Sequence, residues 1–244
     1  MASGVVEGTG TEVLEVDREL PADDPADLPP PPDDDMHVPT GQPVPARYVY
    51  YTSGTTAEPK GARHGDRSLR AASVGMSERL GLAEDDRFAF VFPITHIAGG
   101  VYIYAALAYG LTFVLDAVFD PERTIDLLRR EQITQGGAGT FFHQTYLAAQ
   151  RKLPPGEKLF PKVRTFPGGG APKPPSLHHE MKEAFGVGIV SGYGLTEAPI
   201  LTMNHRDAPD EVLATTEGPA VAGTALRIVT PDGKVAGVGE EGEV

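Results

Sequence analysis

The chain has 244 residues, of which 40% are hydrophobic, so it can bury a substantial core and is not a small disulfide scaffold. The absence of cysteine excludes disulfide bonds and cysteine zinc sites, no apolar run reaches the roughly 18 residues that span a bilayer, and a reducing, cytoplasmic setting is expected. The net charge of -13 is concentrated at the start, because residues 1–40 hold 11 acidic groups and one arginine, which leaves the rest of the chain at only -3.

Residues 1–45 are expected to form an acidic, Pro-rich lead-in rather than a domain. Seven of the 23 prolines lie in the first 40 positions, and four of them are consecutive, at 29–32. Such a segment buries too little apolar surface to offset the entropy lost on ordering. Alternating hydrophobic and acidic residues predict one short strand at 12–16. The acidity therefore describes this segment and says little about the rest of the chain.

Residues 46–202 alternate short β-rich runs with helical runs of about 10 to 15 residues. This pattern predicts crossover connections and an α/β fold with a mainly parallel sheet flanked by helices. The first helix is expected to begin near Asp66, whose side chain would cap the free amides of its first turn, and to stop at Gly81. Pro121 suits the first turn of a later helix. The predicted strands are 48–51, 87–92, 111–115, 135–139, 163–166 and 187–190, and the predicted helices are 66–80, 98–108, 122–131, 142–151 and 175–185.

The alternation stops after residue 202, and a second, smaller unit is expected at 203–244. Residues 225–230 and 235–238, joined by a Pro-Asp-Gly-Lys turn, predict an antiparallel hairpin. The last six residues resemble the entry to a further strand. We therefore predict that a small antiparallel β subdomain starts here and is truncated.

The segment at 51–61, YTSGTTAEPKG, has the composition of an anion cradle. Its hydroxyls and small residues allow close approach to a polyphosphate, and Lys60 supplies a point charge. Gly54 lies six positions before Lys60, so the spacing is not that of a P-loop. A short match of this kind is also typical of an ordinary Ser/Thr/Gly turn. Eleven residues in this order favour phosphate binding.

This loop resembles the signature of the adenylate-forming, or AMP-binding, superfamily, which reads close to YTSGTTGxPKG and usually has glycine at the position of Ala57. Three further segments are similar to motifs of its acyl-CoA synthetase branch: 92–100 (FPITHIAGG), 167–172 (PGGGAP) and 191–197 (SGYGLTE). Alone, each also fits a Gly-rich loop or, for His96, a structural histidine. Their order along the chain favours a site.

The resemblance implies a role for each matching residue. Lys60, Thr196, Glu197 and His96 would be catalytic, with Thr196 at the α-phosphate, Glu197 holding magnesium and His96 between the acid's carboxylate and the phosphates. The ATP phosphates would be bound by Thr52, Ser53, Gly54, Thr55, Thr56 and Lys60. Adenine would be bound by Gly170, Ala171, Pro172, Gly192, Tyr193 and Gly194. The acyl pocket would be lined by His96, Ile97, Gly99, Gly100, Thr140 and Phe141.

The implied reaction activates a carboxylic acid with ATP and Mg²⁺ and then forms a thioester with coenzyme A. No acidic residue occurs at 91–115, where amino-acid-activating relatives place an aspartate, so an apolar acid without an α-amine is expected. The family's chain continues at both ends, including a C-terminal lid domain, so this chain resembles a central segment. The alternatives are a nucleotide-binding but inactive fragment and an amino-acid adenylation domain. No basic patch predicts nucleic-acid binding, and the oligomeric state stays open.

Overall fold

The computed structural model describes residues 47–52, 59–116 and 118–244, which belong to one unit of the chain, residues 44–244. The predicted lead-in and its strand at 12–16 lie outside the described residues and stay predictions. Within the described ranges, no helix combines the length and the apolar composition needed to cross a membrane.

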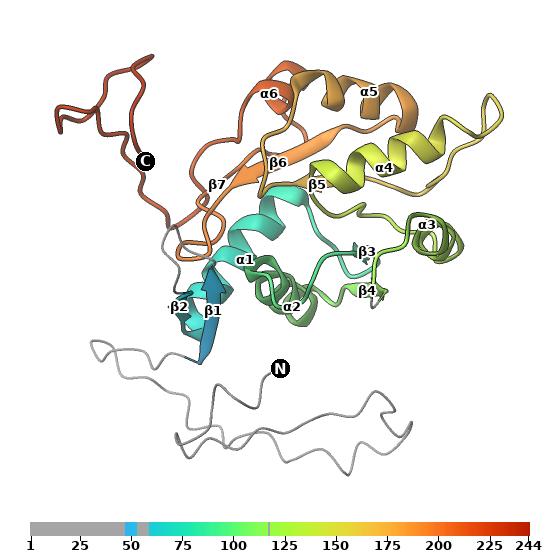
Figure 1. The fold of residues 1–244 in the computed structure, drawn as a ribbon, viewed down its shortest axis with the longest axis horizontal. Helices are drawn as coiled ribbons and strands as arrows, with labels where there is room; N and C mark the ends of the chain where they lie inside the picture. Colours follow the sequence, from blue (N-terminus) through green and yellow to red (C-terminus); the bar gives the residue numbers. More distant parts are fainter. Residues whose placement is uncertain (1–46, 53–58, 117) are drawn as a thin grey trace, which may run out of the picture. The chain divides into compact units, whose positions relative to one another are not determined.

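The described residues form three small sheets (Figure 1). The pairs are β1 (Tyr48–Thr52) antiparallel with β2 (Lys60–His64), β3 (Arg87–Phe90) parallel with β4 (Thr112–Leu115), and β5 (Phe166–Gly168) parallel with β6 (Ile189–Tyr193), which β7 (Thr202–Met203) joins antiparallel. Gln135 makes parallel bridges to Phe88 and to Thr165, so the two parallel pairs run in the same direction. The fold is mixed α/β, and the expected single sheet is divided into smaller pieces.

Two hydrophobic cores lie on opposite faces of β3, because successive side chains of a strand point to opposite sides. Phe88 and Phe90 pack with α1 and α2, whereas Ala89 and Val91 pack with α3, α4 and α5. Figure 1 shows α4 and α5 together, separate from α1 and α2. The helices of the described residues are α1 (Asp66–Leu80), α2 (Ile97–Tyr109), α3 (Pro121–Arg130), α4 (Thr140–Gln150), α5 (Pro175–Phe185) and α6 (Asp210–Thr215).

The ends of two predicted helices can be compared directly with the structure. Helix α1 stops at Gly81, which has the left-handed φ of 60°, and α3 carries Pro121 in its first turn, as expected. The predicted cap of α1 is wrong, because Gly65 occupies the cap position and no side chain caps the helix. The Asp66 carboxylate instead forms an ion pair with Arg47 and accepts a hydrogen bond of 2.6 Å from the Tyr104 hydroxyl.

Two predicted β segments appear only as isolated bridges. The predicted strand 135–139 pairs through Gln135, and the predicted C-terminal hairpin pairs through Val229, which bridges Val235 and Glu243. The expected C-terminal β subdomain is therefore not confirmed, and its boundary after residue 202 stays a prediction. Strands β2 and β7 and helix α6 were not predicted from the sequence.

Candidate functional site

The segments singled out by the sequence follow strands that run in one direction. They come after β3 (91–96), after Gln135 (138–141), after β5 (169–172) and after β6 (194–197). Carboxyl ends of parallel strands meet at one edge of a sheet, which is where ligands bind in open α/β folds. The register supports this arrangement, since β5 is paired with β6 through its last residue, Gly168, and β6 is paired with β7 through its last residue, Tyr193.

The turn at 169–172 contacts both neighbouring segments. A Cβ placed on Gly169 would lie 3.1 Å from the carbonyl oxygen of Gly192, so the two backbones run close together. On the other side, the Thr140 hydroxyl donates a 3.1 Å hydrogen bond to the carbonyl of Pro172. Gly170 has a left-handed φ of 73°, and no atom of the described residues lies within 4 Å of the place where its Cβ would be. The predicted adenine-binding turn is therefore fixed at both flanks and leaves room for a flat ligand at Gly170.

The segment that follows β6 is a tight reversal that carries Thr196 and Glu197. Leu195 and Ala198 exchange backbone hydrogen bonds of 3.0 and 3.2 Å across it. A side chain on Gly194 would meet the backbone nitrogen of Ile200 at 2.5 Å, so only glycine fits there. The Glu197 side chain is exposed at this turn.

The phosphate-loop residues are described only at their two ends. Ser53, Gly54, Thr55 and Thr56 lie outside the described residues. Thr52 ends β1 and Lys60 begins β2, and the two residues are directly paired in the antiparallel register. The loop therefore connects the two strands of a hairpin, and Lys60 is exposed at its base.

His96 lies at the start of α2, where it caps the helix. Its Nδ1 accepts a 3.2 Å hydrogen bond from the backbone N–H of Ala98. Nδ1 can accept only when it carries no proton, so the ring holds its proton on Nε2. Desolvation lowers the pKa of His96, which favours this neutral form at pH 7. Nε2–H is therefore available as a hydrogen-bond donor on an exposed side chain.

The other predicted acyl-pocket residues have different environments. Ile97 is buried in the core with α1. Gly99 is in contact with the Ile94 carbonyl, and Gly100 with the Tyr50 hydroxyl, so neither position has room for a Cβ. These three residues fix the start of α2. Phe141, in contrast, is exposed at the first turn of α4.

An aromatic cluster around Phe141 was not predicted from the sequence. Phe119, Phe141 and Phe142 contact one another edge to face, with ring centroids 4.9 to 5.9 Å apart. Phe119 follows β4, whereas the other two rings belong to α4. No sequence motif marks Phe119, since its partners are more than 20 positions away. The cluster places apolar surface beside Thr140.

Lys173, next to the predicted adenine turn, links that turn to α6 by hydrogen bonds. The Lys173 Nζ donates hydrogen bonds of 2.8 and 2.7 Å to the carbonyls of Leu213 and Ala214, at the C-terminal end of that helix. Burial lowers the pKa of Lys173, and burial raises the pKa of the nearby Glu217. Sequence reasoning did not identify either residue. Their contacts indicate a structural role at the border of the site.

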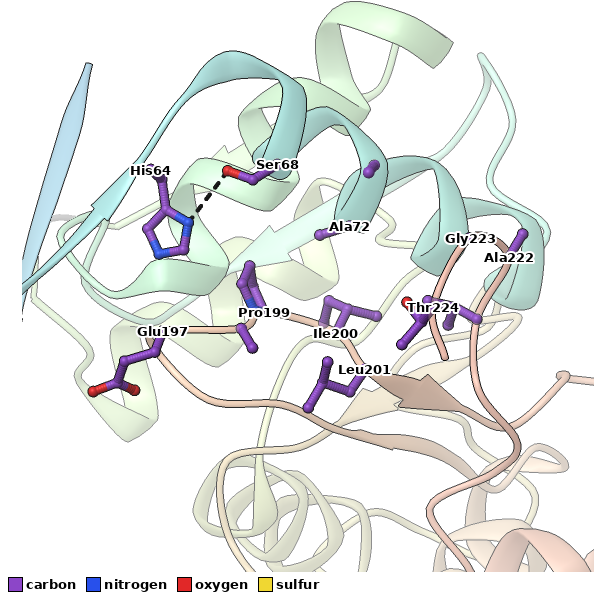
Figure 2. A pocket seen from close by; sticks show the side chains of 13 residues that line it. His64, Ser68, Ala72, Glu197, Pro199, Ile200, Leu201, Ala222, Gly223 and Thr224 are labelled. Carbon is purple, nitrogen blue, oxygen red and sulfur yellow. Dashed lines mark hydrogen bonds between the residues drawn. The ribbon is translucent and has the colours of Figure 1, made fainter. Parts of the chain in front are cut away.

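A cavity of about 240 Å³ adjoins the Glu197 turn (Figure 2). Its walls come from α1, from the turn itself and from residues 221–224. Glu197 and His64 lie at the same end of it, and Glu197 is the one predicted site residue in its lining. His64 is 4% exposed. Sequence reasoning assigned His64 no role, because its contact is with a segment 132 residues away.

A magnesium site would rest on few protein ligands. In the part of the chain that the structure describes, no three His, Asp or Glu side chains converge in the way a metal ion requires. Magnesium commonly takes one or two carboxylates and completes its shell with phosphate oxygens and water. The exposed carboxylate of Glu197 fits that pattern beside a polyphosphate.

Comparison with known proteins gives consistent matches. Residues 4–244 match the family model described as AMP-binding enzyme. A 2-succinylbenzoate–CoA ligase of Bacillus licheniformis is 33% identical over 62% of this chain and 30% of its own length. A feruloyl-CoA synthase of Amycolatopsis is 30% identical over 80% of this chain and 39% of its own.

A solved structure gives the same result. The O-succinylbenzoate coenzyme A synthetase of Bacillus subtilis, in complex with ATP and magnesium, superposes with a TM-score of 0.68 and 27% identity, over 80% of this chain and 39% of that one. The chain thus spans less than two fifths of the length of these relatives.

Proposed function

The chain belongs to the AMP-binding enzyme family, and on this basis we propose that it carries out ATP-dependent activation of a carboxylic acid. The carboxylate attacks the α-phosphorus of ATP, so an O–P bond forms and the bond to pyrophosphate breaks. The thiol of coenzyme A then takes the acyl group, and AMP leaves. The relatives named ligase and synthase support this reaction class, and the thioester step is part of the proposal.

The observation that carries the proposal is the convergence of separate segments at one edge of the strands. The turn at 169–172 contacts Gly192 of β6 and Thr140 of α4. These contacts join the proposed adenine site to the proposed acid site. Tyr193, half-buried at the end of β6, offers an aromatic face for the base, and Gly170 leaves open space for it.

Both reactants are anions, so catalysis must come from positioning and from neutralising charge, and no protein nucleophile is required. Lys60 and Thr52, the strand residues on either side of the connecting loop, are proposed to hold the departing phosphates. His96 in its neutral form donates from Nε2 to an anionic oxygen without adding a full charge. Thr196 is proposed to contact the reacting phosphate. Mg²⁺ held by Glu197 would supply further neutralisation of the polyphosphate.

The proposed acid is apolar. The aromatic cluster of Phe119, Phe141 and Phe142 borders Thr140, and no acidic side chain occurs at 91–115 to bind an ammonium group. Phe141 is 61% exposed and Ile94, in the loop before His96, is 57% exposed. Exposed apolar side chains at a site edge favour an aryl or alkyl tail over a charged one.

The test begins with binding of Mg-ATP to the 244-residue chain, measured by calorimetry. Tyr193→Ala is expected to weaken binding about tenfold through loss of one stacking face. Glu197→Gln is expected to weaken the magnesium-dependent part of binding. Glu183→Gln, which alters an exposed carboxylate on α5, is the matched control and should bind as the wild type does.

The second measurement is ATP–pyrophosphate exchange with a panel of aryl, alkyl and amino acids. Exchange stimulated by aryl or alkyl acids supports the proposal. Mg-ATP binding without exchange favours a nucleotide-binding fragment that does not turn over. Exchange stimulated only by amino acids favours an amino-acid adenylation domain. If wild-type chain neither binds Mg-ATP nor exchanges pyrophosphate, the proposed function is refuted.

A further inference from the structure

The buried histidine of β2 contacts the turn that carries Glu197. The His64 Nε2 lies 2.7 Å from the carbonyl oxygen of Thr196, and the ring is almost fully buried. A carbonyl can only accept, so Nε2 carries the proton and donates it. On the other side, Nδ1 lies 3.3 Å from the Ser68 hydroxyl, and the Tyr50 ring packs edge to face on the imidazole. These contacts fix the orientation of the ring.

The backbone is strained two residues after the turn that His64 contacts. Ile200 has a φ of 51°, in the left-handed region that β-branched residues rarely adopt. Strain of this kind persists only where the surroundings hold the backbone in place, and it concentrates at functional sites. The turn is closed internally by the Leu195–Ala198 pair and by the bond from Leu201 to the Tyr193 carbonyl, at 2.8 Å. His64 adds a contact from a different part of the fold.

The side of this turn that faces α1 borders a cavity. The cavity of about 240 Å³ separates α1 from residues 197–201, so side-chain packing there is incomplete (Figure 2). His64 lies at the end of that cavity next to Glu197. The hydrogen bond from His64 is therefore a contact to this turn from a separate element at that end of the cavity.

We infer that His64 is a positioning residue that holds the Thr196–Glu197 turn against β2, the strand that begins with Lys60. The hydrogen bond thereby ties the turn that carries the proposed magnesium carboxylate to the strand whose other end carries the proposed phosphate cation. This inference rests on the proposed function for the roles of Lys60 and Glu197. The contact itself can be tested without that function.

The first test measures the turn in the free protein. His64→Leu keeps an apolar side chain of similar size and removes the donor, whereas His64→Gln keeps an N–H at the end of a flexible chain. Amide hydrogen exchange at Ala198, whose N–H closes the turn, is expected to accelerate about tenfold in His64→Leu and to recover in His64→Gln. His178→Gln, which alters another fully buried histidine, should leave Ala198 exchange unchanged.

The second test measures Mg-ATP affinity against magnesium concentration. His64→Leu is expected to raise the Kd about tenfold, or about 1.4 kcal/mol, and to require more magnesium, while His64→Gln restores both. Unchanged Ala198 exchange and unchanged magnesium dependence in folded His64→Leu would overturn the inference. If wild-type chain does not bind Mg-ATP, the proposed function fails, and the exchange result still decides whether His64 holds the turn.

A measurement on the wild type covers the case in which His64→Leu does not fold. Nitrogen NMR of the imidazole should find the proton of His64 on Nε2, slow to exchange with water and coupled to the Thr196 carbonyl. A proton on Nδ1 alone would exclude the hydrogen bond and the inference with it.

Discussion

The burial of His143 predicts how the free energy of unfolding depends on pH. His143 belongs to α4 and is 1% exposed, and its imidazole packs edge to face with the Phe166 ring at a centroid distance of 5.9 Å. Burial lowers the pKa of His143 from 6.5 to about 4, the backbone carbonyls of Pro167 and Gly136 offset part of this, and the charge of Lys173 adds to it. The folded protein therefore holds His143 neutral in a pH range where the unfolded chain protonates it.

The direction of the pH effect on stability follows from proton binding. Between pH 6.5 and about 4 the unfolded state binds more protons, so the free energy of unfolding falls as the pH falls. The contribution of His143 is fully present above pH 6.5 and is lost by about pH 4. The separation of the two pKa values corresponds to about 3 kcal/mol over that range, at about 1.4 kcal/mol for each pH unit. That is a large part of the stability of an ordinary domain.

The assay is urea unfolding of wild type and His143→Leu at several pH values from 7.5 to 4.5. Leucine fills a similar volume and removes a buried Nε2 that has no hydrogen-bond partner among the described residues. The difference in unfolding free energy between the two proteins should change by about 2 to 3 kcal/mol across this range, in favour of the variant at low pH. Other groups, such as His96, cancel in that difference. A constant difference would refute the reasoning.

Two further predictions concern a buried ion pair and a tightly packed glycine. Asp86 is fully buried and accepts a 2.5 Å hydrogen bond from Arg164. Burial raises the pKa of Asp86, but its hydrogen bonds lower the pKa by more, so the folded value lies below the unfolded one. The stability that Asp86 contributes is therefore lost only as the pH falls below the unfolded pKa. Asp86→Asn should cost about 3 kcal/mol in urea unfolding at pH 7 and remove that acid dependence; equal stability of both proteins would contradict it. Gly99→Ala should lower the Tm by several degrees because its Cβ meets the Ile94 carbonyl, whereas Gly237→Ala, with 3.6 Å of clearance, should not. Similar Tm values for the two alanine variants would count against this packing argument.

Local sequence signals predicted the parts of the fold that depend on neighbouring residues. Gly81 stops α1 and Pro121 opens α3, because left-handed backbone and fixed φ are properties of single residues. The family was also accessible from short motifs. The roles of individual site residues stay proposals, although the structure brings several of the predicted segments to one edge.

Contacts between distant segments were not predictable. Residues 135–139 were expected as a strand, yet only Gln135 pairs, and the rings of Phe166 and Phe88 occupy the places where side chains of Gly136 and Gly137 would project. Asp66 looked like a helix cap, yet its carboxylate turns to partners elsewhere in the chain. His64 was missed for the same reason. In each case the decisive partner lies far away in sequence.

The alternation of β3 side chains between two cores affects which substitutions the protein can tolerate. The scaffold is secured by residues inside the strands. The proposed adenine and magnesium contacts follow β5 and β6, and the proposed acid contacts follow β3, β4 and Gln135. Ile94 and Phe141 are exposed and belong to neither core, so substitutions there replace no buried core residue. Selection for a new acid could act on these loops independently of the ATP-handling loops, which would let one scaffold acquire many substrates.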